Sequence, residues 1–434
     1  MRKSPTLKIA GGVLGTAMFL TACSGGSSEP ASEVTGETGV EDVTLTVATF
    51  NEFGYEELFD TYMAENTNVT IEQKKAATSN EARDNMNTRL AAGSGLSDIE
   101  AVEVDWLPDL MQSSDLFADL TDDAVEGRWL DWKTEAATSS DGRLIGYGTD
   151  IGPIAVCYRA DLFEAAGLPT DRGEVATMLG STWEDYFDAG KDFVAENGDV
   201  AWFDSAGAIF NARLNQLENA FSSSSEEEQL IPLSENADVK EIYDTTLQAA
   251  VDDKLSAGVS QWSQDWTNGF QNNAFATMMC PSWMLGVIEG NAAGVEGWDV
   301  ADVFPGGGGN QGGSYLTVPT MGANQAEAKK LAAWLTAPEQ QIEAFKAKGT
   351  FPSQTEALDS DALKEVTESF FNDAPVGEIM AARAEAVDVA PYKGPNYFAA
   401  TTIVNDAINR VEVEDVDSID SSWEKAVEQF TNLQ

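Results

Sequence analysis

Residues Val43–Gln73 read VTLTVATFNEFGYEELFDTYMAENTNVTIEQ, and this stretch decides the fold class. Its first part, Val43–Thr49, alternates apolar and polar side chains as a half-buried β-strand does. A turn follows, and Tyr55–Glu65 then carries apolar residues at the spacing of one helix face. Val69–Gln73 alternates again and predicts a second strand. A strand, a helix and a strand within about 30 residues predict a βαβ unit with parallel strands.

The same alternation continues beyond this unit. Asn80–Ala92 has a helical pattern and ends at a Gly-Ser-Gly turn, and Ile99–Val104 is an apolar strand. Repeated βα units predict an α/β fold with a mostly parallel sheet, in which ligands bind beyond the carboxyl ends of the strands. The residues that fall at those ends are Asn51, Glu52, Asp105 and Trp106. An alternative role for Asp105 is to cap a helix that begins at Leu107.

The composition limits the possible functions. The 434-residue chain has 25 Lys and Arg against 73 Asp and Glu, a net charge of −48, and no His. Its 43% hydrophobic content is enough for two or three domains, or for one large bilobal protein. The charge repels nucleic acid and anionic membranes and favours neutral or cationic partners, although an acid-rich surface unrelated to the ligand is an alternative. Because His is the usual general base and a common zinc ligand, we expect no metal site and no cofactor.

The N-terminus has the pattern of a bacterial lipoprotein signal. Basic residues at Arg2, Lys3 and Lys8 precede a short apolar segment that ends in Leu20-Thr21-Ala22-Cys23. The Ser-, Gly- and Glu-rich tract that follows is typical of a flexible tether. We therefore expect a signal peptide at 1–22, a tether at 23–42, and a lipid on Cys23 that anchors the protein to the outer face of the cell membrane.

Two further cysteines, Cys157 and Cys280, both lie in apolar, strand-like runs. In an oxidising compartment they could form a disulfide, but free Cys also behaves as a small buried hydrophobe. The sequence leaves both alternatives open.

The stretch Gln261–Gly286, QWSQDWTNGFQNNAFATMMCPSWMLG, holds three of the eleven Trp residues. Trp262, Trp266 and Phe270 have helical spacing, which favours a shared buried face with at most one ring reaching a ligand. Trp283 follows Pro-Ser at the end of a predicted strand, where a flat ring can lie against a sugar. Taken alone, the stretch favours a hydrophobic core, because aromatic residues bury large areas and dominate cores.

Four segments resemble, in order, one family of proteins. They are the lipobox Leu20–Cys23, the segment VCYRADLFEAAGLP (Val156–Pro169), Thr182–Asp185 (TWED), and the run from Ala276 to Trp283. Together they resemble the extracellular solute-binding proteins (family 1) of bacterial ABC sugar importers, although Pro-Ser stands before Trp283 where Gly is common in the family.

The resemblance implies two α/β lobes joined by a hinge, with a solute in the cleft and no catalysis. The first lobe would comprise 43–149 and 319–351, and the second 150–318 and 352–434. It also implies ABC permease subunits as partners and a monomeric receptor. Nucleic acid is not expected.

The resemblance and the strand-end argument together give the candidate ligand contacts. Asp150 matches a carboxylate at the first hinge crossing, with a turn-forming Asp as the alternative. Trp283 matches a stacking tryptophan of the family, and Tyr397, with Tyr392 as its rival, matches an aromatic of the C-terminal helices. Trp262, Asp265 and Tyr315 are added only because they lie near these motifs in the sequence. The full set is Asn51, Glu52, Asp105, Trp106, Asp150, Trp262, Asp265, Trp283, Tyr315, Tyr392 and Tyr397.

Three functions follow, in order of preference. The first is a receptor for a di- or oligosaccharide, such as a cello- or xylo-oligosaccharide, because aromatic rings fit the apolar faces of sugars and Asp, Glu and Asn bind their hydroxyls. The second keeps the fold but binds a cationic solute such as a polyamine or a peptide. The third is an anchored glycoside hydrolase, which would need two carboxylates at a defined separation.

Overall fold

We describe residues 41–223, 229–389 and 391–433 of a computed structural model. The expected signal peptide, Cys23 and all but the end of the expected tether lie outside the described residues. Within the described ranges, the chain contains no helix that is both long and apolar enough to cross a membrane.

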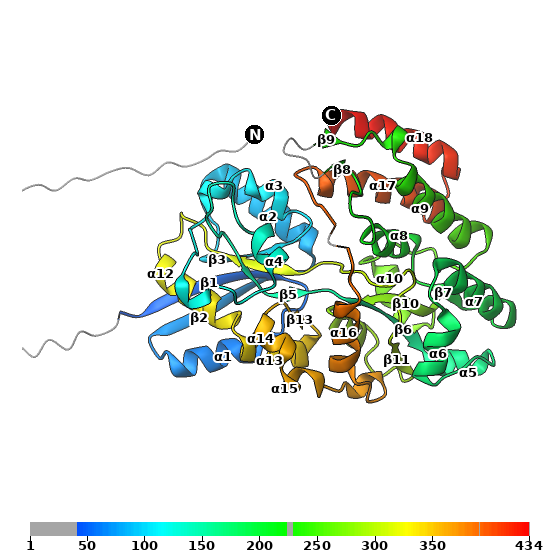
Figure 1. The fold of residues 1–434 in the computed structure, drawn as a ribbon, viewed down its shortest axis with the longest axis horizontal. Coiled ribbons are helices and arrows are strands. Elements are labelled where there is room, and N and C mark those ends of the chain that lie inside the picture. The colour runs from blue at the N-terminus through cyan, green and yellow to red at the C-terminus, as the bar shows by residue number, and fades with distance from the viewer. Residues whose placement is uncertain (1–40, 224–228, 390, 434) are drawn as a thin grey trace, which may run out of the picture. The chain divides into compact units, whose positions relative to one another are not determined.

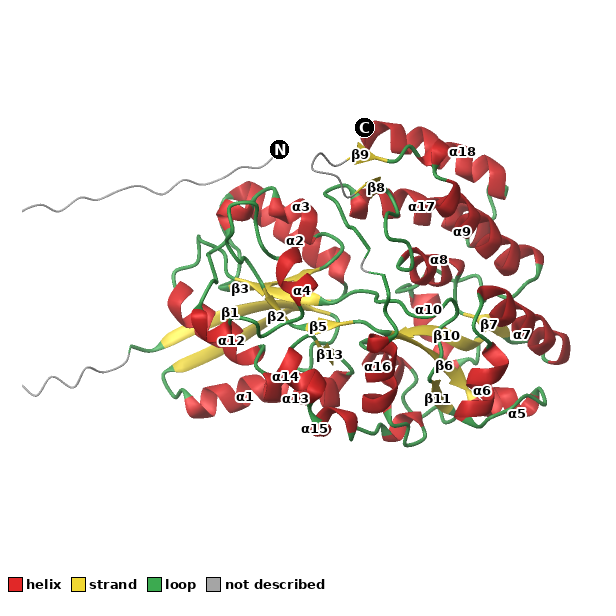
Figure 2. Ribbon diagram, in the orientation of Figure 1, coloured by secondary structure: helices red, strands yellow, loops and turns green. Residues whose placement is uncertain are grey.

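The first lobe is built on a five-stranded sheet in the order β2-β1-β3-β12-β4 (Figures 1 and 2). β1 pairs in parallel with both β2 and β3, as the βαβ pattern predicts, whereas β12 runs antiparallel to β3 and β4. Leu45 and Val47 of β1 are fully buried because alternate residues of a strand face the same side. The strands are β1 (Val43–Phe50), β2 (Val69–Ala76), β3 (Ile99–Glu103), β4 (Tyr147–Gly148) and β12 (Ser314–Thr317).

Helices cover this sheet. α2 begins after Thr78, whose side chain accepts a hydrogen bond from the Glu81 amide, and it ends at Gly93, which has a left-handed backbone (φ 63°). The helices around the first sheet are α1 (Glu56–Glu65), α2 (Ser79–Ala92), α3 (Leu107–Met111), α4 (Asp131–Ala136), α12 (Gln325–Leu335) and α13 (Pro338–Lys348).

The second lobe has a four-stranded sheet in the order β11-β6-β10-β7. Every residue of β6 and β10 is buried, because separate cores cover the two faces of the sheet. Val156 and Tyr158 pack in one core, whereas Ala155 and Cys157 pack in the other. This arrangement explains the continuous apolar runs in the sequence. The strands are β6 (Ile154–Arg159), β7 (Ala201–Phe203), β10 (Phe275–Pro281) and β11 (Trp298–Ala301).

Cys157 of β6 and Cys280 of β10 form a disulfide, with an S–S distance of 2.06 Å. The two strands are antiparallel neighbours in the sheet. The structure therefore selects the disulfide from the two alternatives that the sequence leaves open.

The helices of the second lobe surround its sheet, and the C-terminal helix α17 packs against α8 and α18. α7 begins with a capping box in which Thr182 and Asp185 exchange hydrogen bonds with each other's backbone. A short hairpin is formed by β8 (Ser222–Ser223) and β9 (Gln229–Leu230). The helices are α5 (Ala160–Ala165), α6 (Arg172–Leu179), α7 (Trp183–Glu196), α8 (Ala206–Leu214), α9 (Ala237–Leu247), α10 (Gln264–Gln271), α11 (Met284–Asn291), α14 (Thr355–Asp359), α15 (Asp361–Lys364), α16 (Val376–Glu385), α17 (Tyr397–Glu412) and α18 (Ile419–Phe430).

The segments that cross between the lobes are bonded to one another. In the first crossing, β5 (Asp150–Ile151) pairs with β13 (Phe351–Pro352). The amide of Gln311 donates to the Gly152 carbonyl at 2.8 Å, which joins the first crossing to the second. A side chain at position 152 is excluded, since its Cβ would lie 1.9 Å from the Gln311 carbonyl oxygen.

The predicted lobe boundary at Val318 is wrong. β12 precedes that residue and pairs with β3 and β4, so it belongs to the first sheet. The second crossing therefore lies before Ser314. The Gly-rich stretch 306–313, which the predicted boundaries place inside the second lobe, leads into this crossing.

Candidate functional site

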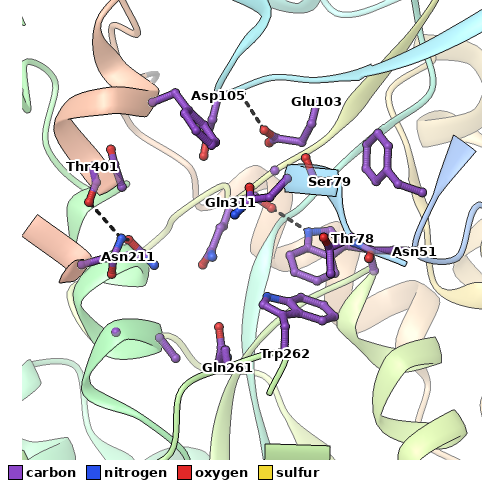
Figure 3. A pocket seen from close by; sticks show the side chains of 18 of the residues that line it. Asn51, Thr78, Ser79, Glu103, Asp105, Asn211, Gln261, Trp262, Gln311 and Thr401 are labelled. Atoms are coloured by element: carbon purple, nitrogen blue, oxygen red, sulfur yellow. Dashed lines mark hydrogen bonds between the residues drawn. The ribbon is translucent and has the colours of Figure 1, made fainter. Parts of the chain in front are cut away.

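A cavity of about 490 Å³ lies between the strand ends of the first lobe and the helices of the second (Figure 3). The loop after β1 and the end of β3 supply one side, while α8 and α17 supply the other. The crossing residues Asp150 and Gln311–Ser314 line it as well. Its walls thus come from parts of the chain that are far apart in sequence.

One wall is aromatic. The rings of Trp262 and Trp283 are stacked, with centroids 6.1 Å apart and planes 20° apart. The Trp283 indole N–H donates to the Gln311 carbonyl at 2.8 Å, which fixes this ring to the second crossing. Trp266 is buried behind Trp262, at a centroid distance of 5.1 Å, and Trp262 remains 39% exposed. The expectation that at most one ring of the pair Trp262 and Trp266 reaches a ligand is consistent with this placement.

Two residues of the cavity have a left-handed backbone that L-residues seldom adopt. Trp262 has φ 69° and Asn51 has φ 45°. Such conformations cost on the order of 1–3 kcal/mol each and persist where surrounding contacts enforce them, most often at functional sites. The backbone therefore directs both side chains to this cavity at an energetic cost.

The opposite wall, on α8 and α17, is rich in amides. The Asn405 side-chain N–H₂ donates to Asn211 Oδ1 at 3.0 Å and to the Thr401 carbonyl at 3.1 Å. Asn215 and Asn409 also line this wall, one helical turn beyond their neighbours, so the amides form a row on each helix. Amide groups provide both donors and acceptors, so this wall suits a neutral polar ligand.

The first-lobe side contains carboxylates that are already paired. Asp105 forms an ion pair with Lys393, which precedes α17, and its amide donates to Glu103 Oε2 at 2.9 Å. Burial, and then the neighbouring Asp105, raise the pKa of Glu103 well above its ordinary value. Glu52 forms an ion pair with Lys75 at 2.6 Å. Little negative charge is left here to attract a cation.

Asp150 connects the two crossings. Its Oδ1 accepts from the Thr149 hydroxyl at 2.6 Å and from the Ser314 amide at 2.9 Å. Burial raises its pKa, against the opposing effect of Lys133. Lys133 is itself fully buried, and burial lowers its pKa to about 8. Asp150 therefore has a structural role in the hinge in addition to its place in the cavity wall.

The structure brings most of the predicted contacts together. Those that line the cavity are Asn51, Glu52, Asp105, Asp150, Trp262, Trp283 and Tyr397. Tyr397 is 2% exposed, with its ring 5.0 Å from Lys393 Nζ, so it contributes mainly to packing there.

Four predicted contacts are placed elsewhere. Trp106 turns inward and donates to the Ser79 hydroxyl at 3.0 Å. Asp265 is exposed on the first turn of α10, and Tyr315 is fully buried with its ring 4.0 Å from Lys133 Nζ. Tyr392 lines a different cavity, together with residues of α3, α4 and the segment before α17. Nearness in sequence was the only reason to include Asp265 and Tyr315, and it does not fix the direction of a side chain.

The polar residues of α8, α17 and the loop before α10 were missed. They include Gln261, Asn211, Asn215, Thr401, Asn405 and Asn409. A signal was present, because Asn at i and i+4 recurs, at 211 and 215 and again at 405 and 409. No three His, Cys, Asp or Glu residues of the described chain are arranged to hold a metal ion.

Comparison with known proteins places the chain in a family. Residues 57–372 match the model of the bacterial extracellular solute-binding proteins. The arabinooligosaccharide-binding protein of Bacillus subtilis (strain 168) is 26% identical over 62% of this chain. The match spans 61% of that relative's length.

Solved structures extend the likeness. A crystal structure described as an extracellular solute-binding protein of family 1 is 49% identical, with a TM-score of 0.77, and the match covers 90% of this chain and 99% of that one. The ABC transporter associated binding protein of B. animalis subsp. lactis Bl-04, in complex with β-1,6-galactobiose, is 20% identical over 90% of this chain and 96% of its own, with a TM-score of 0.76. The second likeness shows a shared fold. The chain thus has the predicted bilobal fold and belongs to the bacterial extracellular solute-binding protein family.

Proposed function

We propose that this protein is the oligosaccharide receptor of an ABC importer, anchored outside the cell membrane through a lipid on Cys23. One observation carries the proposal: the stacked pair Trp262 and Trp283 faces a cavity whose opposite wall is a row of amides. A sugar has apolar C–H faces, which an indole ring can cover, and hydroxyl edges that need both donors and acceptors.

Unsatisfied acceptors in the cavity support a hydroxylated ligand. The side-chain oxygens of Asn51 and Asn215 are buried and make no hydrogen bond within the described part of the chain. A buried acceptor without a donor costs about 1–3 kcal/mol, and a ligand hydroxyl would remove that cost. The two residues belong to different lobes, so one ligand that satisfies both would favour closure of the lobes.

The electrostatics favour a neutral solute over a cation. Glu52 and Asp105 are paired with Lys75 and Lys393, and Asp150 accepts hydrogen bonds from within the hinge. Internal lysines and hinge hydrogen bonds therefore offset part of the charge of the lining carboxylates, which also include Asp406 of α17. A polyamine would have to compete with internal lysines for these carboxylates.

The relatives support the sugar class and differ in the sugar itself. One similar protein is described as an arabinooligosaccharide-binding protein, and another is in complex with β-1,6-galactobiose. The cavity volume of about 490 Å³ falls within the roughly 300–1,000 Å³ of small-molecule sites. A short oligosaccharide is the proposed ligand, with arabino-, galacto-, cello- and xylo-oligosaccharides as the first to test.

The test is a thermal-shift panel of these oligosaccharides together with spermidine and short peptides. A ligand at 100 times its Kd stabilises the native state by about 2.7 kcal/mol, which gives a clear rise in Tm. We expect at least one neutral oligosaccharide to raise Tm, and Trp283→Ala to abolish that rise. A shift with spermidine or a peptide and with no sugar would overturn the proposal.

The anchor has a separate test. The full-length protein, expressed in a bacterium with labelled palmitate, should carry label and stay with the membrane fraction. Cys23→Ala should remove the label. A labelled Cys23→Ala protein would refute the anchor and leave the sugar proposal untouched.

A further inference from the structure

We infer that Asp204, which is not part of the cavity wall, is the positioning residue that holds the aromatic wall in its binding geometry. The inference rests on the proposed function, because it assumes that Trp262 and Trp283 contact the ligand. Asp204 follows β7 and is fully buried in the second lobe.

One oxygen of Asp204 holds the chain on both sides of Trp262. Its Oδ2 accepts from the Gln261 side-chain amide at 2.9 Å and from the Trp266 indole N–H at 2.8 Å. Gln261 lines the cavity and precedes Trp262 directly, while Trp266 lies against the ring of Trp262. A single buried carboxylate thus restrains the residue before Trp262 and the ring behind it.

Trp262 needs such a restraint. It has a left-handed backbone with φ 69°, and 39% of the residue is exposed, so burial alone fixes it only in part. Neighbouring backbone bonds contribute as well, because the Ser263 amide donates to the Ser260 carbonyl at 3.1 Å and the Ser263 hydroxyl caps α10. These bonds set the turn, whereas the contacts of Asp204 reach the side chains on either side of the exposed ring.

The charge of Asp204 is not explained by stability. Its second oxygen, Oδ1, is buried without a hydrogen-bond partner in the described residues, and burial raises its pKa to about 6. An Asn would accept the same two hydrogen bonds without burying a charge, and a buried charge is costly. An amide at this position keeps an oxygen acceptor for both donors, although its hydrogen bonds are weaker than those to a carboxylate.

A second carboxylate, which is partly buried, lies in the same region and holds different partners. Glu412, at the end of α17, accepts from the Ala206 amide at 2.8 Å and from the Ser256 hydroxyl. Its contacts secure the start of α8 and not the aromatic wall. The positioning role is therefore assigned to Asp204 alone.

The experiment compares Asp204→Ala with Asp204→Asn in the mature protein. Asp204→Ala removes the acceptor, and we expect affinity for the oligosaccharide identified in the panel to fall at least fivefold. Asp204→Asn keeps an acceptor, and we expect affinity within threefold of wild type. The control is Asp299→Asn, a buried carboxylate of the same lobe that pairs with Arg172 at 2.6 Å and does not line the cavity. It should leave affinity unchanged.

A readout without ligand separates this inference from the proposed function. The near-UV circular dichroism of the stacked indoles is obtained by subtracting the spectrum of Trp262→Ala from that of the wild type. We expect Asp204→Ala to lose this signal and Asp204→Asn to keep it. If no oligosaccharide binds the wild type, the proposed function fails and this signal still decides the positioning role. If Asp204→Ala does not fold, Gln261→Met replaces it in this ligand-free measurement, because it removes one donor to the carboxylate and leaves every indole in place. The inference is overturned if the variant tested keeps the wild-type signal, or if Asp204→Asn loses signal and affinity as fully as Asp204→Ala.

Discussion

Replacing Trp262 by Ala removes the most exposed ring of the cavity, and the structure sets the size of the expected effect. The residue is 39% exposed, and a full Trp surface of about 250 Å² then leaves about 100 Å² for a sugar to cover. At about 25 cal/mol per Å², complete coverage contributes about 2.5 kcal/mol, or roughly 70-fold in Kd. Coverage of half that area contributes about 1.2 kcal/mol, or roughly eightfold. We therefore expect Trp262→Ala to weaken binding by about 8- to 70-fold.

The assay is isothermal titration calorimetry with the oligosaccharide identified in the panel. Trp334→Ala is the matched control, because Trp334 is a partly buried first-lobe ring that contacts Tyr62 at 5.2 Å and does not line the cavity. It should reduce stability and leave Kd unchanged. A loss below threefold in Trp262→Ala, or an equal loss in Trp334→Ala, would refute the assignment of Trp262 as a ligand platform.

Three other predictions concern stability. Burial raises the pKa of Glu412 from 4.5 to about 7, so between these pH values the native state holds a proton that the unfolded state has lost, and the stability of the wild type falls as pH rises. In urea titrations from pH 4 to pH 8, the free energy of unfolding of Glu412→Gln should therefore rise relative to wild type by up to about 3 kcal/mol. A difference between the two proteins that does not change with pH would contradict this prediction. The double substitution Cys157→Ala/Cys280→Ala removes a disulfide that links residues 123 positions apart. It should lower the free energy of unfolding by about 2–4 kcal/mol in the same titrations and leave sugar affinity unchanged. An unchanged Tm would show that the bond does not form. Trp262→Gly should be more stable than Trp262→Ala by about 1 kcal/mol, because Gly tolerates a left-handed backbone, and the reverse order would contradict φ 69°.

The fold was predictable because local patterns and global architecture agree. The alternation in Val43–Thr49 and in Val69–Gln73 predicts strands that the structure confirms as β1 and β2. The pairing of β12 was not predictable, since nothing in four residues specifies which of two sheets a crossing strand joins. Hydrogen-bond partners across 164 positions, such as Asp150 and Ser314, decide that question.

The site was predictable where a residue's position follows from its element. Asn51 and Asp105 lie at strand ends, and strand ends of one sheet share an edge. Tyr315 was predicted to contact the ligand but is buried in the core. Consecutive residues of a strand point to opposite faces, so a shift of one position along the strand decides between cavity and core. Asn211 and Asn405 were missed because they meet across 194 positions, and only the packing of α17 on α8 brings them together.

The disulfide between Cys157 and Cys280 makes the stability of this protein depend on whether its surroundings are oxidising or reducing. Both cysteines lie in a covered core, so a reductant reaches the bond only after the second lobe has opened. In a reducing cytosol the two strands would be held by packing and hydrogen bonds alone, and the chain would unfold more readily. Outside the membrane, where the family works, oxidation joins the central strands of the lobe covalently. The same sequence is therefore easier to unfold before export and harder to unfold afterwards.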